Sequence, residues 1–215
     1  PLSICTFTRS FRYKPCFAVT NVFPFPYFQR FVNNDFPSDH HPTSTKAEYF
    51  PSLVLNDSLF ELKVIDLPAI KYFPSNSLVE WSEFKYFGLR SAAAYLMVYD
   101  VSDLSTFQFV KSIRDQIFHS REMTNIPVIV VANKMDLIAD RENGTAADAT
   151  SRERKDIIHT VKKTWKTSHM ECSAKYNWNV MSVFKELAVK LDMVANGQVI
   201  GYQSTSSRKK LCLVF

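Results

Sequence analysis

Two continuous apolar segments, Ala92–Tyr99 and Val128–Ala132, constrain the fold of this chain more than any other feature. A polar residue follows each segment, Asp100 after the first and Asn133 after the second. Uninterrupted apolar runs of this length are typical of strands that are buried on both faces, as in a parallel sheet. The sequence therefore predicts a central sheet that is covered by helices on both sides.

Shorter patterns predict the remaining strands and helices. Further strands are predicted at Tyr49–Leu55, Leu59–Ile65 and Met170–Cys172, the first two joined by a turn. Apolar residues at helical spacing predict three helices, marked by Phe107–Ile117, Ile157–Trp165 and Val180–Leu191. Strands that alternate with helices predict an α/β fold of three layers, with a mostly parallel central sheet and helices on both faces.

Two local details complete the predicted architecture. Ser105 is the expected N-cap of the first helix, because serine side chains accept hydrogen bonds from free backbone N–H groups. The polar residues 139–152 are predicted to form a surface loop. In open sheets of this kind, ligands bind beyond the carboxyl ends of the strands, where Asp66, Asp100, Asn133 and Ser173 fall.

Composition excludes several classes of protein. The formal net charge is +5, but acidic and basic residues are mixed along the chain, which argues against a nucleic-acid partner. The four cysteines lie far apart and lack zinc-site spacing. A disulfide framework is not expected in a chain of this size, which indicates a reducing compartment. No apolar run approaches the roughly 20 residues that a membrane-spanning helix needs.

Two polar motifs follow consecutive predicted strands. Asn133-Lys134-Met135-Asp136 comes after the strand at Val128–Ala132, and Ser173-Ala174-Lys175 comes after the next strand. Guanine presents two adjacent donors, a ring N–H and an amino group, and one carboxylate can accept from both. Adenine lacks this pattern. The motifs resemble the N-K-x-D and S-A-K motifs with which Ras-like small GTPases read guanine.

The resemblance gives each motif residue a role. Asp136 would accept from the two guanine donors, Asn133 would tie the two loops together, and the stem of Lys134 would pack on the base. The backbone N–H of Ala174 would meet the guanine carbonyl oxygen. The implied guanine-binding set is Asn133, Lys134, Asp136, Ser173, Ala174 and Lys175.

The resemblance extends over residues 30–195 and implies a P-loop NTPase-like fold with GTP or GDP and Mg²⁺ as cofactors. His41-Pro42-Thr43 looks like the first switch, in which the family's threonine binds magnesium. Asp66 looks like the start of the family's D-x-x-G motif and would hold magnesium through water. The alternative interpretation makes Thr43 an ordinary loop residue and Asp66 the end of a strand.

The phosphate half of the family's site is missing from the sequence. The family's loop is G-x-x-x-x-G-K-[ST], whose backbone N–H groups and lysine hold phosphate. At the corresponding spacing the chain has Ala18–Phe25, with Pro24 at the lysine position and Phe25 at the hydroxyl position. There is no glycine before Gly88. These residues cannot cradle a triphosphate.

A second departure concerns hydrolysis. In Asp66-Leu67-Pro68-Ala69-Ile70, alanine replaces the D-x-x-G glycine, and Ile70 replaces the glutamine that orients the attacking water in the family. Isoleucine can neither donate nor accept a hydrogen bond. We therefore assign no catalytic residue and expect at most weak GTP hydrolysis.

Residues 1–29 form an atypical N-terminal segment. Phe23–Gln29 can be encoded almost entirely by pyrimidines ending in CAG, which is typical of a translated intron end. One hypothesis is that residues 1–29 are not native, and the other is a truly diverged N-terminus. The first strand is expected to be abnormal or missing, and if it is missing, the sheet has an exposed gap and the chain should be poorly stable.

The end of the chain carries a lipidation signal. Cys212-Leu213-Val214-Phe215 is a C-a-a-X box whose terminal phenylalanine favours geranylgeranyl, and Arg208-Lys209-Lys210 stands just before it. A lipid and a basic cluster together hold a protein at a membrane better than one lipid alone. We expect residues 196–215 to be a flexible tail that is prenylated at Cys212. The expected location is the cytoplasmic face of the plasma membrane.

Two functions of different classes follow. The first is a membrane-anchored GTP/GDP switch in signal transduction, whose switch regions contact effector and regulator proteins. The second is a non-catalytic interaction module with little nucleotide binding, because the phosphate loop is absent. No nucleic acid is expected as a partner of either.

Overall fold

The computed structural model describes residues 14–20, 30–36, 46–55, 58–66, 70, 72–82, 88–139 and 147–198. These residues form a seven-stranded sheet with the order β2-β4-β1-β5-β6-β7, and β3 pairs with β4 beside this path. The strands are β1 (Lys14–Thr20), β2 (Ala47–Tyr49), β3 (Ser52–Leu55), β4 (Ser58–Asp66), β5 (Ala94–Asp100), β6 (Val128–Asn133) and β7 (Ser168–Glu171).

Most of the sheet is parallel, as the sequence predicts. β1 pairs in parallel with β4 and β5, β5 with β6, and β6 with β7. Only β2 and β3 run antiparallel to their partner β4 in the described sheet. All seven residues of β5 and all six of β6 are buried. This burial explains why both strands are continuous apolar runs.

The first strand is present, so the sheet is continuous where a missing strand would have left a gap. β1 lies between β4 and β5, with Ala18 opposite Asp66 on one side and Leu96 on the other. Lys14–Thr20 contains no glycine and supplies a complete run of extended backbone. A central strand needs only this backbone pairing, which an atypical sequence can still provide.

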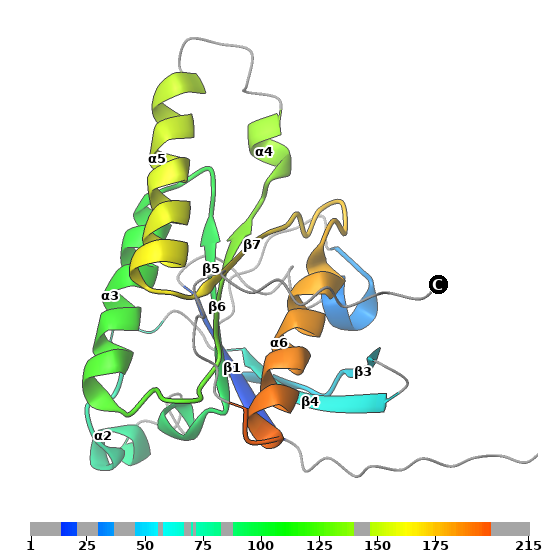
Figure 1. Ribbon diagram of the computed structural model, residues 1–215, viewed down its shortest axis with the longest axis vertical. Coiled ribbons are helices and arrows are strands. Elements are labelled where there is room, and N and C mark those ends of the chain that lie inside the picture. Colours follow the sequence, from blue (N-terminus) through cyan, green and yellow to red (C-terminus); the bar gives the residue numbers. More distant parts are fainter. Residues whose placement is uncertain are drawn as a thin grey trace, which may run out of the picture.

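Helices cover both faces of the sheet (Figure 1). α3 (Ser105–Ser120) and α5 (Ala147–His159) lie on one face, and α6 (Val180–Ala195) lies on the other. The shorter elements are α2 (Ser77–Ser82), the 3₁₀ turn η2 (Leu89–Ser91), α4 (Asp136–Ala139) and the π-helical turn η3 (Thr160–Thr164), which continues α5. Residues 30–33 add a helical turn beside α6.

Each face of the sheet has its own apolar core. One core joins β5 and β6 to α3 and α5 and includes Tyr99, Phe107 and Val161. The other joins the opposite faces of the strands to α6 and includes Phe184, with Phe31 of the helical turn packed against it. The rings of Phe31 and Phe184 are stacked, with their centres 3.5 Å apart. The predicted three-layer arrangement is confirmed.

Three local predictions are wrong. The strand predicted at Tyr49–Leu55 divides into β2 and β3, because Pro51 has no N–H to give to the ladder. Ser105 is the first residue of α3 rather than its cap, and its N–H donates to Oδ1 of Asp103 at 3.0 Å. The loop predicted at residues 139–152 already turns into helix at Ala147.

Among the described residues, no helix combines the length and the apolar character that crossing a membrane requires.

Candidate guanine-base site

The polar residues at the strand ends lie along one edge of the sheet. Asp66 ends β4, Asp100 ends β5, and Asn133 ends β6. Asp100 and Asn133 stand opposite each other in the ladder. Ser173 follows β7, two residues after the strand ends at Glu171. Because β5, β6 and β7 are parallel, the two predicted base-reading motifs start from the same edge (Figure 1).

Asn133 joins the two motif loops through a single side-chain oxygen. Its Oδ1 accepts a hydrogen bond from the backbone N–H of Ala174 at 3.1 Å and from the Cys172 thiol at 3.5 Å. Burial, with a smaller effect of the Asp136 charge, raises the pKa of the Cys172 thiol, so this group keeps its proton. The structure thus shows Asn133 tying the loops together, as the resemblance implies.

Backbone bonds hold the same two loops in register. The N–H of Cys172 donates to the carbonyl of Ala132 at 2.8 Å, and the N–H of Met135 donates to the carbonyl of Cys172 at 3.2 Å. Ser173 and Trp178 exchange two backbone hydrogen bonds of 3.0 Å. The loop that carries Ser173 is therefore closed on itself as well as fastened to the end of β6.

Asp136 is oriented by Ser173. The Ser173 hydroxyl donates to Oδ1 of Asp136 at 2.5 Å, and the N–H of Tyr176 donates to the same hydroxyl oxygen at 3.3 Å. Within the part of the chain that the structure describes, Oδ2 of Asp136 receives no hydrogen bond. A carboxylate held through one oxygen still has lone pairs for two further donors. Its geometry suits the paired donors of guanine.

Lys134 is anchored to the neighbouring strand. Its Nζ lies 2.7 Å from Oδ2 of Asp100, and its backbone is left-handed, with φ of 65°. Oδ1 of Asp100 accepts from both the N–H and the hydroxyl of Ser102, at 2.8 and 2.6 Å. The ion pair fixes the ammonium group of Lys134 at the sheet edge. The packing of its stem on a base stays a prediction.

The other two predicted residues are placed differently. The N–H of Ala174, which the resemblance directs at the guanine carbonyl, donates to Asn133 in this structure. Base binding would require Asn133 to share or release that N–H. Lys175 is exposed, and its Nζ lies 5.2 Å from the centre of the Tyr176 ring. The structure brings Lys175 into the same loop, and within the described ranges its ammonium has no polar partner.

Of the two predicted magnesium ligands, the structure places Asp66 alone. Asp66 is fully buried at the end of β4. Burial is the main cause that raises the pKa of Tyr49, and the charge of Asp66 adds to it. A carboxylate is the kind of ligand that Mg²⁺ favours. No group of three or more His, Cys, Asp or Glu side chains that could hold a metal occurs among the described residues.

Several predicted positions fall outside the described residues: Thr43, Pro24, Phe25 and Cys212. The first residues of the expected phosphate-loop position are described. Ala18, Val19 and Thr20 lie in β1, opposite Leu96, Met97 and Val98 of β5.

Ile70, at the position of the family's catalytic glutamine, is part of the core. It is buried beside Phe73 in the cluster that includes α3 and β5. The N–H of Phe73 donates to the side-chain oxygen of Gln116 in α3, at 2.8 Å. This segment is thus fastened to the body of the protein, and the Ile70 side chain faces apolar neighbours.

Sequence reasoning missed three residues that organise the site. Asp100 was recognised as a strand-end residue but not as the partner of Lys134. Cys172 was interpreted as the end of a strand, whereas its thiol contacts Asn133. Arg30 gave no signal, yet its guanidinium contacts the Ala174 and Lys175 carbonyls. The strand order could have suggested Asp100, because β5 and β6 are neighbours.

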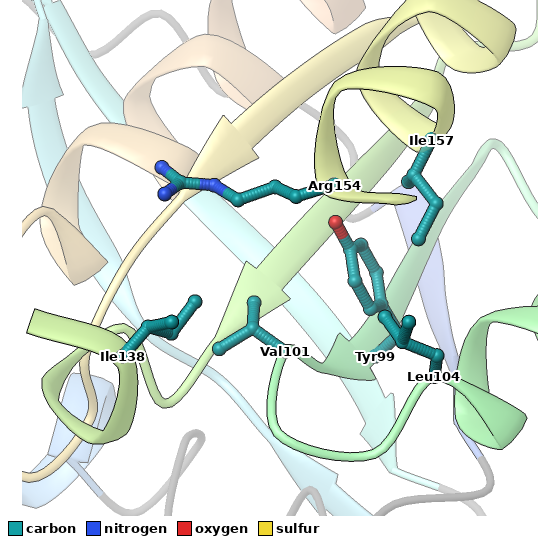
Figure 2. A pocket seen from close by; sticks show the side chains of 6 residues that line it. All are labelled: Tyr99, Val101, Leu104, Ile138, Arg154 and Ile157. Carbon is teal, nitrogen blue, oxygen red and sulfur yellow. The ribbon is translucent and has the colours of Figure 1, made fainter. Parts of the chain in front are cut away.

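A small pocket lies next to this edge but contains none of the predicted base-reading side chains (Figure 2). It is lined by Tyr99, Val101, Leu104, Ile138, Arg154 and Ile157. The hydroxyl of Tyr99 lies 3.0 Å from Nε2 of His169. Arg154 at its rim forms an ion pair of 2.8 Å with Glu171. The apolar lining and these internal pairings leave the pocket outside the candidate site.

Comparison with known proteins identifies the lineage. The family model described as Ras family matches residues 27–193. Human Ras-like protein family member 10B is 38% identical over 161 residues, which are 74% of this chain and 75% of that protein. Mouse Ras-like protein family member 10A is 32% identical over 162 residues, with 74% and 75% covered.

A more distant relative covers more of the chain. GTP-binding protein Di-Ras2 from Macaca fascicularis is 27% identical over 184 residues, which are 84% of this chain and 82% of that protein. The matched family range includes both predicted base-reading motifs, and β1 lies before it. The chain belongs to the Ras family of small GTPases.

Proposed function

We propose that this chain is a guanine-nucleotide switch that binds GTP and GDP, hydrolyses GTP weakly and is attached to a membrane through a prenyl group on Cys212. Its Ras-family relatives support a small-GTPase role in signalling. The observation that carries the proposal is the orientation of the Asp136 carboxylate. Its Oδ1 accepts a hydrogen bond of 2.5 Å from the Ser173 hydroxyl, and Asn133 holds the loop of Ser173 through the Ala174 N–H.

The orientation of the Asp136 carboxylate is set by the chain's own Ser173 hydroxyl. A carboxylate that already has a fixed orientation loses little conformational freedom when a base binds. Its remaining lone pairs match the ring N–H and amino group of guanine, whereas adenine presents a different edge. The base site therefore supports selectivity for guanine over adenine, by roughly 1–3 kcal/mol for a good two-bond contact.

The weak hydrolysis in the proposal depends on Ile70. A side chain that is 2% exposed within an apolar core cannot orient water, and isoleucine lacks the polar atoms for it. If Mg²⁺ binds with the nucleotide, Asp66 would hold it through water and Thr43 would be the second ligand. The ion would neutralise phosphate charge there.

The partners follow from the same proposal. Effector and regulator proteins would contact the switch segments, around Thr43 and over residues 66–75. The basic residues Arg208–Lys210 would add attraction to anionic lipid at the prenylated tail. The proposed place of action is the cytoplasmic face of the plasma membrane, and no nucleic acid takes part.

Loading the full chain with radiolabelled GTP tests the switch function. We expect GTP to stay bound after rapid filtration and to release phosphate slowly, and we expect Asp136→Ala to lose the retained nucleotide. Asp192→Ala removes a carboxylate from α6 and is the matched control. Rapid phosphate release, or equal retention by Asp136→Ala, would contradict the proposal.

A second candidate, a non-catalytic interaction module, is favoured by the placement of β1. The backbone of Ala18–Thr20 is part of the ladder with β5, so its N–H groups are not arranged as a phosphate cradle. Affinities of guanosine, GMP, GDP and GTP separate the two candidates. A switch should bind more tightly as phosphates are added, whereas a base site alone should bind all four about equally.

A further inference from the structure

The guanidinium of Arg30 joins the helical turn 30–33 to the loop that follows β7. Its Nε donates to the carbonyl of Ala174 at 2.9 Å, and its Nη2 donates to the carbonyl of Lys175 at 3.1 Å. Its Nη1 donates to the carbonyl of Asn34 at 2.9 Å. More than 140 positions of sequence separate Arg30 from this loop.

Three further contacts hold the helical turn and the loop in place. The Arg30 guanidinium lies over the ring of Phe36, 5.7 Å from its centre. The side-chain amide of Asn177 donates to Oδ1 of Asn34 at 2.9 Å. The ring of Phe31, next to Arg30, stacks on Phe184 of α6. The turn therefore has apolar support from α6 and polar contacts to the loop.

The two carbonyls that Arg30 holds belong to the residues that the site uses. Ala174 provides the N–H that reaches Asn133, and Ser173, just before it, orients Asp136. A planar guanidinium can donate to two peptide carbonyls at once in a fixed geometry, which a lysine ammonium does not reproduce. Hydrogen bonds from a charged donor are also stronger than neutral ones.

We infer that Arg30 is a positioning residue for base recognition, which holds the Ser173–Lys175 loop so that Asp136 keeps its orientation toward a guanine base. This inference rests on the proposed function, because it gives a purpose to the same site. Arg30 acts through Ser173 and Ala174 and does not itself touch the base. Loss of the guanidinium should loosen the loop and weaken discrimination by Asp136.

The test compares GDP with inosine diphosphate, which lacks the amino group of guanine and so loses one of the two donors to Asp136. In the wild-type full chain, GDP should bind more tightly than inosine diphosphate. Arg30→Met should reduce GDP affinity by roughly tenfold and bring the ratio of the two affinities toward one. Arg30→Lys should fall between the wild type and Arg30→Met.

Arg90→Met is a matched control. Arg90 makes the same kind of contact away from the site, to the carbonyls of Pro74, Ser75 and Ser120 at 2.8 to 2.9 Å. It should lower the melting temperature but keep the ratio of GDP to inosine diphosphate affinity. A lower melting temperature with an unchanged ratio in Arg30→Met would overturn the inference, because that is the behaviour of a merely structural residue.

Amide hydrogen exchange on the ligand-free chain adds a second readout. The N–H groups of Tyr176 and Asn177 donate within the loop, at 3.3 and 3.4 Å, and should exchange faster in Arg30→Met. Unchanged exchange there would overturn the inference. If Arg30→Met fails to fold, Arg30→Lys provides both readouts. A wild-type chain that binds GDP no better than ADP would instead overturn the proposed function, and the inference with it.

Discussion

At the scale of single residues, the candidate site depends on a few oxygen atoms with defined donors. Oδ1 of Asn133 accepts hydrogen bonds from Ala174 and Cys172, and Oδ1 of Asp136 accepts one from Ser173. The sequence predicted these acceptors, because the two motifs follow buried strands. It could not predict the donors, since a hydrogen-bond partner from another loop depends on how the sheet is assembled.

Asp136→Asn should exchange guanine for xanthine. Asparagine keeps an oxygen for the Ser173 hydroxyl and the ring N–H, but it offers an N–H₂ group where guanine also has a donor. Xanthine carries a carbonyl there, so the variant should favour xanthosine diphosphate over GDP by roughly tenfold or more. Competition binding on the full chain measures this preference.

The control for that exchange is Asp192→Asn, which makes the same chemical change in α6. It should leave the preference for GDP unchanged. If Asp136→Asn still favours GDP, Asp136 does not read the base.

Ile70→Gln should not restore hydrolysis. The side chain is buried among apolar residues, so a glutamine there would bury an amide without hydrogen-bond partners. We expect a loss of roughly 2–3 kcal/mol in the free energy of unfolding. Denaturant titration measures the stability, and phosphate release from bound GTP measures the activity.

Ile70→Val is the control for packing alone and should cost about 0.5–1.5 kcal/mol. Faster phosphate release by Ile70→Gln would show that this position reaches the nucleotide, in conflict with its burial.

At the scale of elements, the apolar pattern of the sequence predicted the type of each helix or strand better than the residues at which it begins and ends. β5 and β6 were predictable because a strand buried on both faces consists almost entirely of apolar residues. The division at Pro51 and the start of α5 at Ala147 were missed, since they depend on single backbone N–H groups and on a short polar helix. β1 was missed because its sequence shows no regular alternation of apolar and polar residues. Its stability comes from backbone pairing with β4 and β5.

β7 places a histidine in the interior. His169 is buried, and its Nε2 lies 3.0 Å from the hydroxyl of Tyr99. Burial is the main cause that lowers the pKa of His169 to about 4, from the ordinary value of 6.5. Between these two pH values the unfolded chain binds a proton that the folded chain does not. The free energy of unfolding should therefore fall as pH falls from about 6.5 toward about 4.

His169→Gln should flatten that pH dependence. Glutamine can still bond to the Tyr99 hydroxyl but does not titrate, so a slope of up to about 1.4 kcal/mol per pH unit should disappear. Urea titrations at several pH values between 4 and 7 measure it. His159→Gln changes an exposed histidine in α5 and should keep the wild-type slope. Equal slopes in wild type and His169→Gln would contradict the account.

At the scale of the whole molecule, two apolar cores on either side of one sheet hold the site in place. α3 and α5 build one core, and α6 builds the other. The three layers and the polar edge where the two motifs start could be predicted from the sequence, because buried strands and helix faces leave periodic apolar patterns. The contacts of Arg30 could not be predicted, since they join segments that only the folded sheet brings together.

The proposed membrane attachment is tested on the whole chain. Cys212→Ser should shift the protein from the membrane to the soluble fraction of expressing cells, because the proposed prenyl site is lost. Replacing Arg208, Lys209 and Lys210 by Gln should weaken attachment in part, at roughly 1 kcal/mol for each charge. Cys5→Ser, a cysteine change outside the C-a-a-X box, is the control. Membrane association that survives Cys212→Ser would contradict prenylation at this residue.

The central claim is that this Ras-family chain binds the guanine base although its sequence contains no G-x-x-x-x-G-K-[ST] motif. Calorimetric titration of GDP and of ADP into the full 215-residue chain tests it most directly. The account predicts saturable binding of one GDP per chain and at least roughly tenfold weaker binding of ADP. Equal affinity for the two nucleotides, or no binding of either, would contradict it.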